Sequence, residues 1–507
     1  MKQESHTVLQ GPMLWITALV LTAGNFVAIL DSTIANVSVA HIAGGLGASN
    51  SQGTWVITSY AVAEAITVPL TGWLSKRFGA TRIFCYALVS FGICSALCGL
   101  AHSLGFLIFA RVLQGFAGGP LMPLSLTLLL RIFPKEKGAL ANGVWATTTL
   151  VAPVIGPILG GWLCDEYNWP WIFYINVPIA VICGSFLFVI FHNHREELQK
   201  HPIDKVGLLL LVIWVSALQI MMDEGKDKDW FASNYIITLA IIAAIGFAAF
   251  MIWEITQKKD PIVDLTVFRH RGFSASVLTL TLGFGAFFGI NVLTPLWLQT
   301  NMGYTATWAG LATVWTGLSA LIISPAVTTL SSRIDGRKLV FGGVLWMGGV
   351  TFIRSFLNTD VDYWTIAMPL LVMGLGMPFF MIPISAQAMM SVKPEEMESA
   401  AGLMNFLRTI AGAFATSLVN TVWENQTNYK HEQLSVLLDP NGTYFRNLIS
   451  SGLDTEVARG MIDQLTTSQS VMLATNDIML YSSVAFAIAA FAIWLGPNTR
   501  KRQTKNQ

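Results

Sequence analysis

The sequence is poor in charge. Only 12% of its 507 residues are Asp, Glu, Lys or Arg, whereas 53% are hydrophobic. Soluble domains carry roughly a quarter of charged residues, so this composition excludes an ordinary soluble protein and indicates one that lies in lipid. The formal net charge of +1 gives no reason to expect nucleic acid or an acidic substrate as a partner.

The sequence also has few residues suited to a disulfide framework, a metal site or a phosphate loop. Its five cysteines lie mostly in apolar segments, where they are expected to act as small buried hydrophobes. The eight histidines are not spaced as metal ligands. Gly115, Gly118 and Gly119 are not followed by Gly-Lys-Ser/Thr, so helix contacts explain them better than phosphate binding. We therefore expect no metal, no cofactor and no enzyme.

Long apolar segments dominate the chain instead. A window of about 19 residues finds fourteen of them, which predicts an all-α polytopic membrane protein with fourteen transmembrane helices. They cover approximately residues 13–36, 54–74, 83–101, 106–130, 140–163, 170–191, 206–222, 234–254, 274–298, 306–330, 339–357, 364–390, 398–423 and 471–495. The first follows a short polar leader without a convincing cleavage site and is expected to be a retained span.

The basic residues predict the orientation of these spans. If the N-terminus is cytoplasmic, most of the 30 lysines and arginines fall on the inner face. Those on the outer face are Lys226, Lys228, Lys430, Arg446 and Arg459. Because positive residues concentrate on the cytoplasmic side, both termini are predicted to be cytoplasmic.

Two halves are visible in the pattern of spans and loops. A short basic turn at residues 75–82 has a counterpart at 331–338, which predicts two six-helix bundles related by duplication. We expect the first bundle in residues 1–200, two inserted spans in 201–258 and the second bundle in 259–507. The largest polar stretch, 424–470, is expected to be an outer loop, in part short amphipathic helix.

Residues 147–163 form an apolar segment with an unusual density of helix breakers. The breakers are Pro153, Gly156, Pro157, Gly160 and Gly161. Such residues are tolerated in a lipid-embedded helix where neighbouring helices or water satisfy the backbone, or where two backbones approach closely. The segment is predicted to be a moving or tightly contacting part of the molecule.

Glu64 is the only charged residue between Thr54 and Leu74, and it lies at the middle of that span. A charge at the bilayer centre costs at least about 2.5–3.5 kcal/mol, and a short carboxylate stem cannot reach either surface. A low dielectric disfavours the charged form of a carboxylate, so Glu64 is a candidate proton carrier. A buried side chain with only a structural role is the alternative.

Asp31 and Arg111 lie at similar depths in the first and fourth spans. An ion pair between them is geometrically allowed and would neutralise two otherwise costly charges. The alternatives are that the first helix ends at Asp31 and that Arg111 extends to the surface.

Three more ionisable residues lie in the second half. Arg408 lies near mid-depth in its span, as a candidate cavity residue or fixed charge. Arg354 and Asp477 lie near outer span ends, where an extended side chain or a helix dipole explains them structurally.

Five motifs, together covering the whole chain, resemble those of the major facilitator superfamily, in particular its fourteen-span drug:proton antiporters and their multidrug efflux pumps. They are residues 30–37 (LDSTIANV) and Arg111, Gln114 and Gly115 (Arg-x-x-Gln-Gly), the span-five pattern Ala152, Gly156, Pro157, Gly160 and Gly161, residues 171–178 (WIFYINVP), and residues 260–265 (DPIVDL). The loop after span two keeps Gly72, Leu74, Arg77 and Gly79 of the family pattern, but Lys76 replaces its Asp and Ala80 an Arg. The resemblance therefore does not extend to a charge relay through that Asp.

This resemblance implies a proton-coupled exporter of hydrophobic or amphipathic drugs that works by alternating access. We assign proton coupling to Asp31, Glu64 and Arg111, and the substrate cavity to Glu64, Gln114 and Arg408. Conformational change is assigned to Gly72, Arg77 and Gly79 and to Gly156, Pro157, Gly160 and Gly161. Glu64 belongs to no family motif, so its role depends on burial alone.

The resemblance also implies a location in the bacterial inner membrane, with a periplasmic adaptor protein and an outer-membrane channel as partners. One alternative is a dedicated exporter of an endogenous metabolite such as a siderophore or fatty acid. A uniporter or importer is less consistent with the span-five pattern. A membrane-embedded enzyme or sensor would need a catalytic constellation or an output domain, and neither is visible in the sequence.

Overall fold

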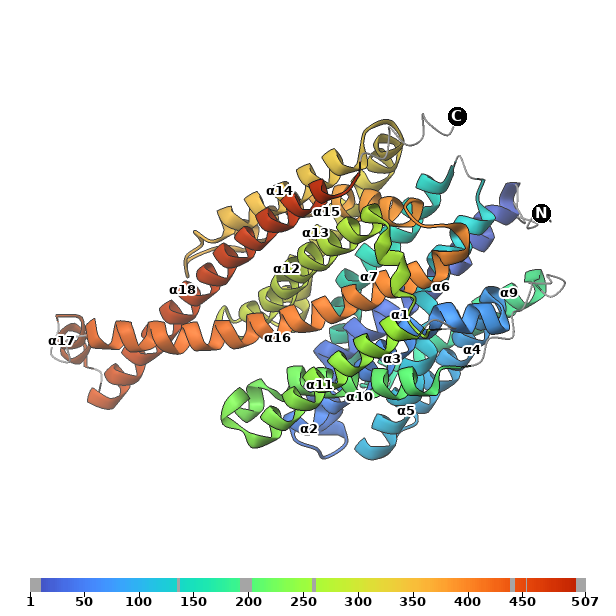
Figure 1. Cartoon of the computed structure of the whole chain (residues 1–507). Helices are drawn as coiled ribbons and strands as arrows, with labels where there is room; N and C mark the ends of the chain where they lie inside the picture. Colours follow the sequence, from blue (N-terminus) through green and yellow to red (C-terminus); the bar gives the residue numbers. More distant parts are fainter. Residues whose placement is uncertain are drawn as a thin grey trace, which may run out of the picture.

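The computed structural model describes residues 11–134, 137–191, 203–257, 261–437, 443–452 and 454–497. Within these ranges every regular element is a helix, and the long helices run roughly side by side (Figure 1).

The helices follow one another with short connections. The first half contains α1 (Gly11–Gly45), α2 (Asn50–Gly53), α3 (Trp55–Phe78), α4 (Ala80–Gly99), α5 (Leu104–Gly118), α6 (Leu121–Ile132), α7 (Gly138–Glu166), α8 (Trp171–Tyr174) and α9 (Asn176–Phe191). Then come α10 (Lys205–Glu224) and α11 (Asn234–Thr256). The second half contains α12 (Arg271–Asn301), α13 (Ala306–Arg333), α14 (Gly336–Arg354), α15 (Tyr363–Met390), α16 (Met397–Leu437), α17 (Thr443–Ser450) and α18 (Thr455–Ala492). Short 3₁₀ helices are η2 (Lys226–Lys228), η3 (Trp230–Ala232), η4 (Leu265–Arg269), η5 (Pro394–Glu396) and η6 (Ile493–Leu495).

Twelve helical stretches in the described part of the chain are long and apolar enough to cross a membrane. The fourteen spans expected from the sequence are thus supported only in part, because α3 and α14 are not among the twelve. Both are long, with 24 and 19 residues. However, α3 contains Glu64, Lys76 and Arg77, and α14 contains two arginines, a lysine and several glycines, which lower the mean hydropathy.

The helices form two bundles. In the N-terminal bundle (α1 to α9), α1 contacts α7, α3 contacts α5, and α4 contacts α5 and α9. In the C-terminal bundle (α12 to α18), α12 contacts α16 and α18, while α15 contacts α13 and α14. The pair α10 and α11 forms a hairpin whose first helix lies against α3 and α16. The bundles meet where α7 lies on α13 and α15, and where α16 lies on α3 and α6.

The polar stretch 424–470 contains the expected short amphipathic helix, α17 (Thr443–Ser450), but much of the rest is not loop. α16 continues through it to Leu437, and α18 already begins at Thr455. Figure 1 shows α16 and α18 extending together beyond the neighbouring helices to α17. Polar residues lower the hydropathy at the end of α16 and the start of α18 without ending either helix, so the sequence indicated a loop where two helices continue.

The breaker-rich segment is one uninterrupted helix. α7 runs from Gly138 to Glu166 with Pro153 and Pro157 inside it. Its glycines allow a close approach to α1: a Cβ at Gly156 would overlap Thr33 Oγ1, and one at Gly160 would lie 3.1 Å from the Ile34 carbonyl oxygen. Gly161 is also buried. In this structure the segment is a tight helix contact, one of the two interpretations that the sequence left open.

Adding one methyl group at this contact is expected to destabilise the protein. Gly→Ala inside a helix normally raises the free energy of unfolding by about 0.5–1 kcal/mol. Gly156→Ala should instead lower it by roughly 1–3 kcal/mol, because the added methyl group overpacks the contact. Gly349→Ala in α14 is the matched control, because a Cβ there meets nothing within 4 Å. Thermal unfolding of the two purified variants in one detergent should give a lower midpoint for Gly156→Ala, and equal midpoints would contradict a tight contact between α1 and α7.

Candidate functional site

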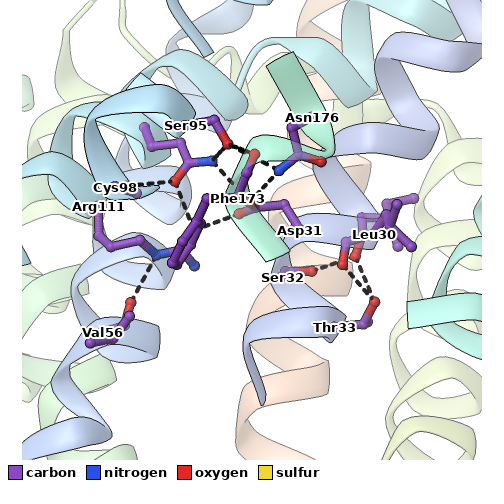
Figure 2. Close-up of polar contacts among 12 residues, drawn as sticks. Leu30, Asp31, Ser32, Thr33, Val56, Ser95, Cys98, Arg111, Phe173 and Asn176 are labelled. Carbon is purple, nitrogen blue, oxygen red and sulfur yellow. Dashed lines mark hydrogen bonds and ion pairs between the residues drawn. The ribbon is translucent and has the colours of Figure 1, made fainter. Parts of the chain in front are cut away.

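The N-terminal bundle contains a buried ion pair. Arg111 Nη1 of α5 donates to Asp31 Oδ2 of α1 over 2.5 Å (Figure 2). The two residues are 0% and 1% exposed. α1 continues to Gly45, so Asp31 lies inside the helix, and Arg111 does not reach the surface. The pairing that the sequence allowed is therefore present.

Three polar side chains complete a network around this pair. Asp31 Oδ1 accepts from Gln114 Nε2 at 2.9 Å and from Asn176 Nδ2 at 2.7 Å. Both amides also donate to Ser95 Oγ, at 3.2 and 3.1 Å. The Ser95 hydroxyl donates to the Phe173 carbonyl oxygen at 2.8 Å. Figure 2 shows how α1, α4, α5 and α9 each bring a side chain to this point.

Arg111 has further contacts that hold its guanidinium group. Its Nε donates to the Val56 carbonyl oxygen at 3.0 Å, and Nη1 also donates to Gln114 Oε1 at 2.8 Å. Its Cζ lies 4.2 Å from the centre of the Tyr60 ring, a cation–π contact. The carboxylate neutralises the cation, and hydrogen bonds satisfy most remaining polar atoms, which is the condition under which a buried pair is tolerable.

The sequence identified only part of this network. Gln114 was expected to line a substrate cavity, but it is 0% exposed and its amide is engaged inside the network. Ser95 and Asn176 were not identified as site residues. A signal was available for both: Ser95 is a polar residue in an apolar span, and Asn176 belongs to a quoted motif.

Glu64 of α3 is half-buried. The charges of Arg408 and Arg111 both act on its carboxylate. Among the described residues, no hydrogen bond or ion pair to this carboxylate is formed. Glu64 therefore differs from Asp31, whose two oxygens are both engaged, and its proton exchange would disturb no existing hydrogen bond.

Arg408 of α16 lies where the two bundles meet. It is 4% exposed, and its guanidinium contacts the thioether of Met122 in α6. Its Cζ lies 5.2 Å from the ring centre of Phe284 and 5.8 Å from that of Trp145. The side chain thus brings a positive charge to an aromatic surface shared by both bundles.

A small hollow of about 20 Å³ adjoins this aromatic surface. Its lining comes from both bundles: Thr149, Pro153, Phe284, Phe287, Phe288, Asn291, Thr316, Gly317, Ala320 and Met377. Glu64, Gln114 and Arg408, the residues expected to line a cavity, are not in this lining. Arg408 reaches it only through Phe284. The lining is mostly apolar and aromatic, and in this conformation the space between these side chains holds no more than about one or two water molecules.

Gly72, Arg77 and Gly79, the first part of the conformational motif, lie at the end of the molecule that carries Arg77, Arg131 and Arg337, here called the basic end. Gly79 ends α3 with φ +93°, a backbone angle that favours glycine. A Cβ at Gly72 would lie 3.1 Å from the Cα of Ser399 in α16. Arg77 lies 5.5 Å from the Trp73 ring centre. Gly72 therefore permits a close contact between the bundles.

Two polar contacts also join the bundles in the half nearer the basic end. Arg131 of α6 pairs with Glu398 of α16. Asn142 Nδ2 of α7 donates to the Ile382 carbonyl oxygen of α15 over 2.6 Å. In this state two sets of contacts join the bundles at the basic end. In one set α16 contacts α3 and α6, and in the other α15 contacts α7.

Loss of the Arg131–Glu398 pair is expected to loosen the basic end. Glu398 is 5% exposed but the Arg131 side chain is 42% exposed. Glu398→Gln should therefore lower the free energy of unfolding by roughly 1 kcal/mol, which is less than the loss expected when a fully buried pair is broken. Amide hydrogen exchange at the start of α16 should become about fivefold faster. The matched control is Glu456→Gln, which removes the exposed pair with Arg459. Unchanged exchange in Glu398→Gln would show that the pair does not hold the bundles together.

Comparisons with known proteins agree with this architecture. Residues 21–416 match the description Major Facilitator Superfamily. The multidrug export protein EmrB of Escherichia coli K12 is 39% identical over 496 residues, covering 97% of each chain. EmrB of Haemophilus influenzae is 42% identical over 496 residues, covering 96% of each. The fatty acid resistance protein FarB of Neisseria gonorrhoeae is 39% identical over 485 residues, covering 95% of each.

Solved structures share the fold at low sequence identity. The proton:xylose symporter XylE has a TM-score of 0.60 and 14% identity over 96% of each chain. The human organic anion transporter MFSD10 has a TM-score of 0.56 and 13% identity, covering 94% of this chain and 100% of that one. The chain therefore belongs to the Major Facilitator Superfamily, as a multi-pass membrane transporter and not an enzyme, in the group that includes EmrB and FarB.

Proposed function

We propose that the protein is a proton-coupled antiporter that exports hydrophobic or amphipathic drugs from the cytoplasm by alternating access. The observation that carries the proposal is the arrangement of two carboxylates: Asp31 is closed in a buried pair with Arg111, whereas Glu64 is half-buried and under the charges of Arg408 and Arg111. The EmrB relatives are named multidrug export proteins, which supports the same direction and substrate class.

The two carboxylates supply a mechanism for coupling. A proton that binds Asp31 neutralises the carboxylate and leaves the positive charge of Arg111 without its counter-ion. A proton on Glu64 removes the negative charge that faces Arg408. Either event changes the free-energy difference between the inward-open and outward-open conformations, and so shifts their populations. One proton moving down a potential of 100 mV supplies about 2.3 kcal/mol.

The proposed architecture has fourteen spans, with α3 and α14 added to the twelve that are apolar enough alone. Both lie within the bundles, where Gly72 of α3 and Gly343 and Gly348 of α14 allow other helices to approach closely. Two six-helix bundles, residues 1–200 and 259–507, would rock about the central hollow, with residues 201–258 as an inserted pair. The basic end faces the cytoplasm by the positive-inside rule, which places both termini there, in a bacterial inner membrane.

The extension of α16 and α18 beyond the other helices then lies on the periplasmic side. It is the part of the described chain best placed to meet a periplasmic adaptor protein, which would pass substrate to an outer-membrane channel. This tripartite assembly is part of the proposal. Small amphipathic substrates, protons and the lipid bilayer complete the set of partners.

A dedicated exporter of an endogenous metabolite, such as a siderophore or fatty acid, is the second candidate. The relative FarB is named a fatty acid resistance protein, which favours a fatty acid within this class. Competition distinguishes the two candidates: unrelated dyes should compete with one another for a multidrug transporter and should not compete with the cargo of a dedicated one.

The test of the proposal is reconstitution of the purified chain in liposomes with an imposed pH gradient. Several chemically unrelated amphipathic compounds should move against their gradients, and collapse of the pH gradient should stop this movement. Equal transport after collapse, with no other ion gradient present, would refute proton coupling.

A further inference from the structure

Arg354 is a buried cation at the end of α14 in the C-terminal bundle. It is 1% exposed, so it does not extend to the surface as the sequence suggested. Its Nη2 donates to Thr294 Oγ1 of α12 at 2.9 Å, and its Nη1 lies 3.9 Å from Met373 Sδ of α15. Its Nε has no hydrogen-bond partner. The guanidinium group therefore has an unused donor inside the bundle.

No carboxylate of the described residues pairs with Arg354, and none acts on its charge. Arg111 differs, because Asp31 compensates its charge at 2.5 Å. Arg408 differs as well, because the charge of Glu64 acts on it. A guanidinium group is not deprotonated in proteins, so Arg354 keeps a charge that the described residues leave uncompensated. Such a buried charge is costly unless an anion pairs with it.

Arg354 lines a small hollow of about 10 Å³, which has room for about one particle of the size of water. The helices α12, α13 and α15 supply the rest of the lining, including Asn291 and Thr316. The Thr316 hydroxyl is 96% buried within its residue, which is 4% exposed, and it has no hydrogen-bond partner. Two unpartnered polar groups from different helices therefore lie at one hollow.

The free polar groups around this hollow can all donate a hydrogen bond. Arg354 Nε can only donate, and the Thr316 hydroxyl and the Asn291 amide each carry donors. The Thr294 hydroxyl already donates its hydrogen to the Ile290 carbonyl oxygen at 2.9 Å. No carboxylate is in the lining. A small particle that accepts hydrogen bonds and carries a negative charge suits this arrangement.

We propose that this hollow binds a chloride ion, which is the counter-ion of Arg354 in the folded protein. Chloride is monatomic, is little larger than a water molecule and accepts hydrogen bonds from any direction. Arg354 Nε and the Thr316 hydroxyl donate to it, and the Asn291 amide is a third donor. Hydrogen bonds between a guanidinium group and an anion are stronger than those between neutral groups. The site is separate from the export function, because the ion is held by the fold and is not transported.

The ion contributes to the stability of the C-terminal bundle. Its proposed donors belong to α14, α13 and α12, and Arg354 also contacts α15 through Met373. A ligand that binds the folded state but not the unfolded state raises stability with the logarithm of its concentration. The thermal stability of the protein is therefore expected to depend on chloride.

The experiment measures thermal unfolding of the purified full chain in one detergent while sodium chloride replaces sodium gluconate at constant ionic strength. Gluconate is too large for the hollow, so it cannot act as the counter-ion. The midpoint should rise by at least about 2 °C in chloride, and bromide should have a similar effect. Equal midpoints in chloride and gluconate would overturn the proposal, because a water molecule in the hollow would give that result.

Arg354→Gln removes the charge that the ion compensates, so its midpoint should not respond when chloride replaces gluconate. Arg459→Gln is the matched control, because it removes an exposed arginine of α18 and should keep the response of the unaltered chain. An equal response in Arg354→Gln would show a general effect of salt and would also overturn the proposal.

Thr316→Val keeps the buried cation and removes one donor, and it provides an independent variant in case Arg354→Gln does not fold. The chloride concentration that gives half of the rise in midpoint should increase at least about fivefold. An unchanged concentration would contradict the assignment of the site to this hollow.

Crystals of the full chain soaked in bromide give the position of the ion directly. The anomalous signal should peak within hydrogen-bond distance of Arg354 Nε. Bromide peaks at the protein surface only would contradict the proposal.

Discussion

Asp31→Asn is expected to reduce proton-driven export by at least about a hundredfold. The asparagine keeps the size of the side chain and can still accept a hydrogen bond from Gln114 or Asn176, but it removes the counter-ion of Arg111 inside the bundle. Breaking one partner of a buried pair costs about 3–5 kcal/mol, and each 1.36 kcal/mol is a factor of ten in rate. The variant also cannot bind and release a proton.

Stability and coupling must be separated in this experiment. The double variant Asp31→Asn/Arg111→Gln removes both charges and should recover thermal stability, because no unpaired charge remains in the network. It should not recover gradient-driven export. If the double variant regains both, the pair has only a structural role.

Asp477→Asn in α18 is the matched control for Asp31→Asn. Asp477 is also an ion-paired aspartate, with Lys430 at 3.2 Å, but its side chain is 28% exposed. Its loss should change export little, since water can solvate the remaining lysine. Accumulation of a fluorescent amphipathic substrate in proteoliposomes, at equal protein content, measures both variants. Undiminished export by Asp31→Asn would exclude Asp31 as a necessary proton carrier.

The pair of Asp31 and Arg111 could be predicted because depth in a span can be counted from its ends. Two opposite charges at the same depth in hydrocarbon are expected to form an ion pair, because either charge alone would be costly there. The rest of the network could not be predicted in this way. Ser95 and Asn176 are uncharged, so a single polar residue in a span costs little enough to have many explanations, and only the arrangement of α4 and α9 brings them to Asp31.

The helices and their order could be predicted from the sequence. The prediction was less accurate where a helix contains enough polar residues to lower its hydropathy. The hydropathy window predicted spans at α3 and α14, whereas neither is among the twelve described helices that are apolar enough to cross a membrane. It indicated a loop where α16 and α18 continue, because polar residues lower hydropathy whether or not a helix ends. Arg354 was assigned to a surface because its depth was known but its direction was not.

Glu64→Gln is expected to uncouple export from the proton gradient while leaving the fold intact. Among the described residues nothing hydrogen-bonds to the Glu64 carboxylate, so no buried group loses a partner when the amide replaces it. The thermal midpoint should therefore fall less than in Asp31→Asn, because Arg408 loses the attraction of a nearby carboxylate but no direct ion pair or hydrogen bond is broken. Glutamine carries no titratable proton, so the dependence of export on an imposed pH gradient should fall at least tenfold, about 1.4 kcal/mol.

Glu424→Gln is the matched control for Glu64→Gln. Glu424 lies in α16, half-exposed and 3.2 Å from Lys226, outside the region where Arg408 and Arg111 act on Glu64. Export by this control should keep its pH dependence. The two carboxylate variants then separate the proton paths: dependence retained only in Glu64→Gln would assign the proton to Asp31, and dependence retained only in Asp31→Asn would assign it to Glu64. Retention in both would exclude both carboxylates, and the free energy for export would then have to come from another ion or another group.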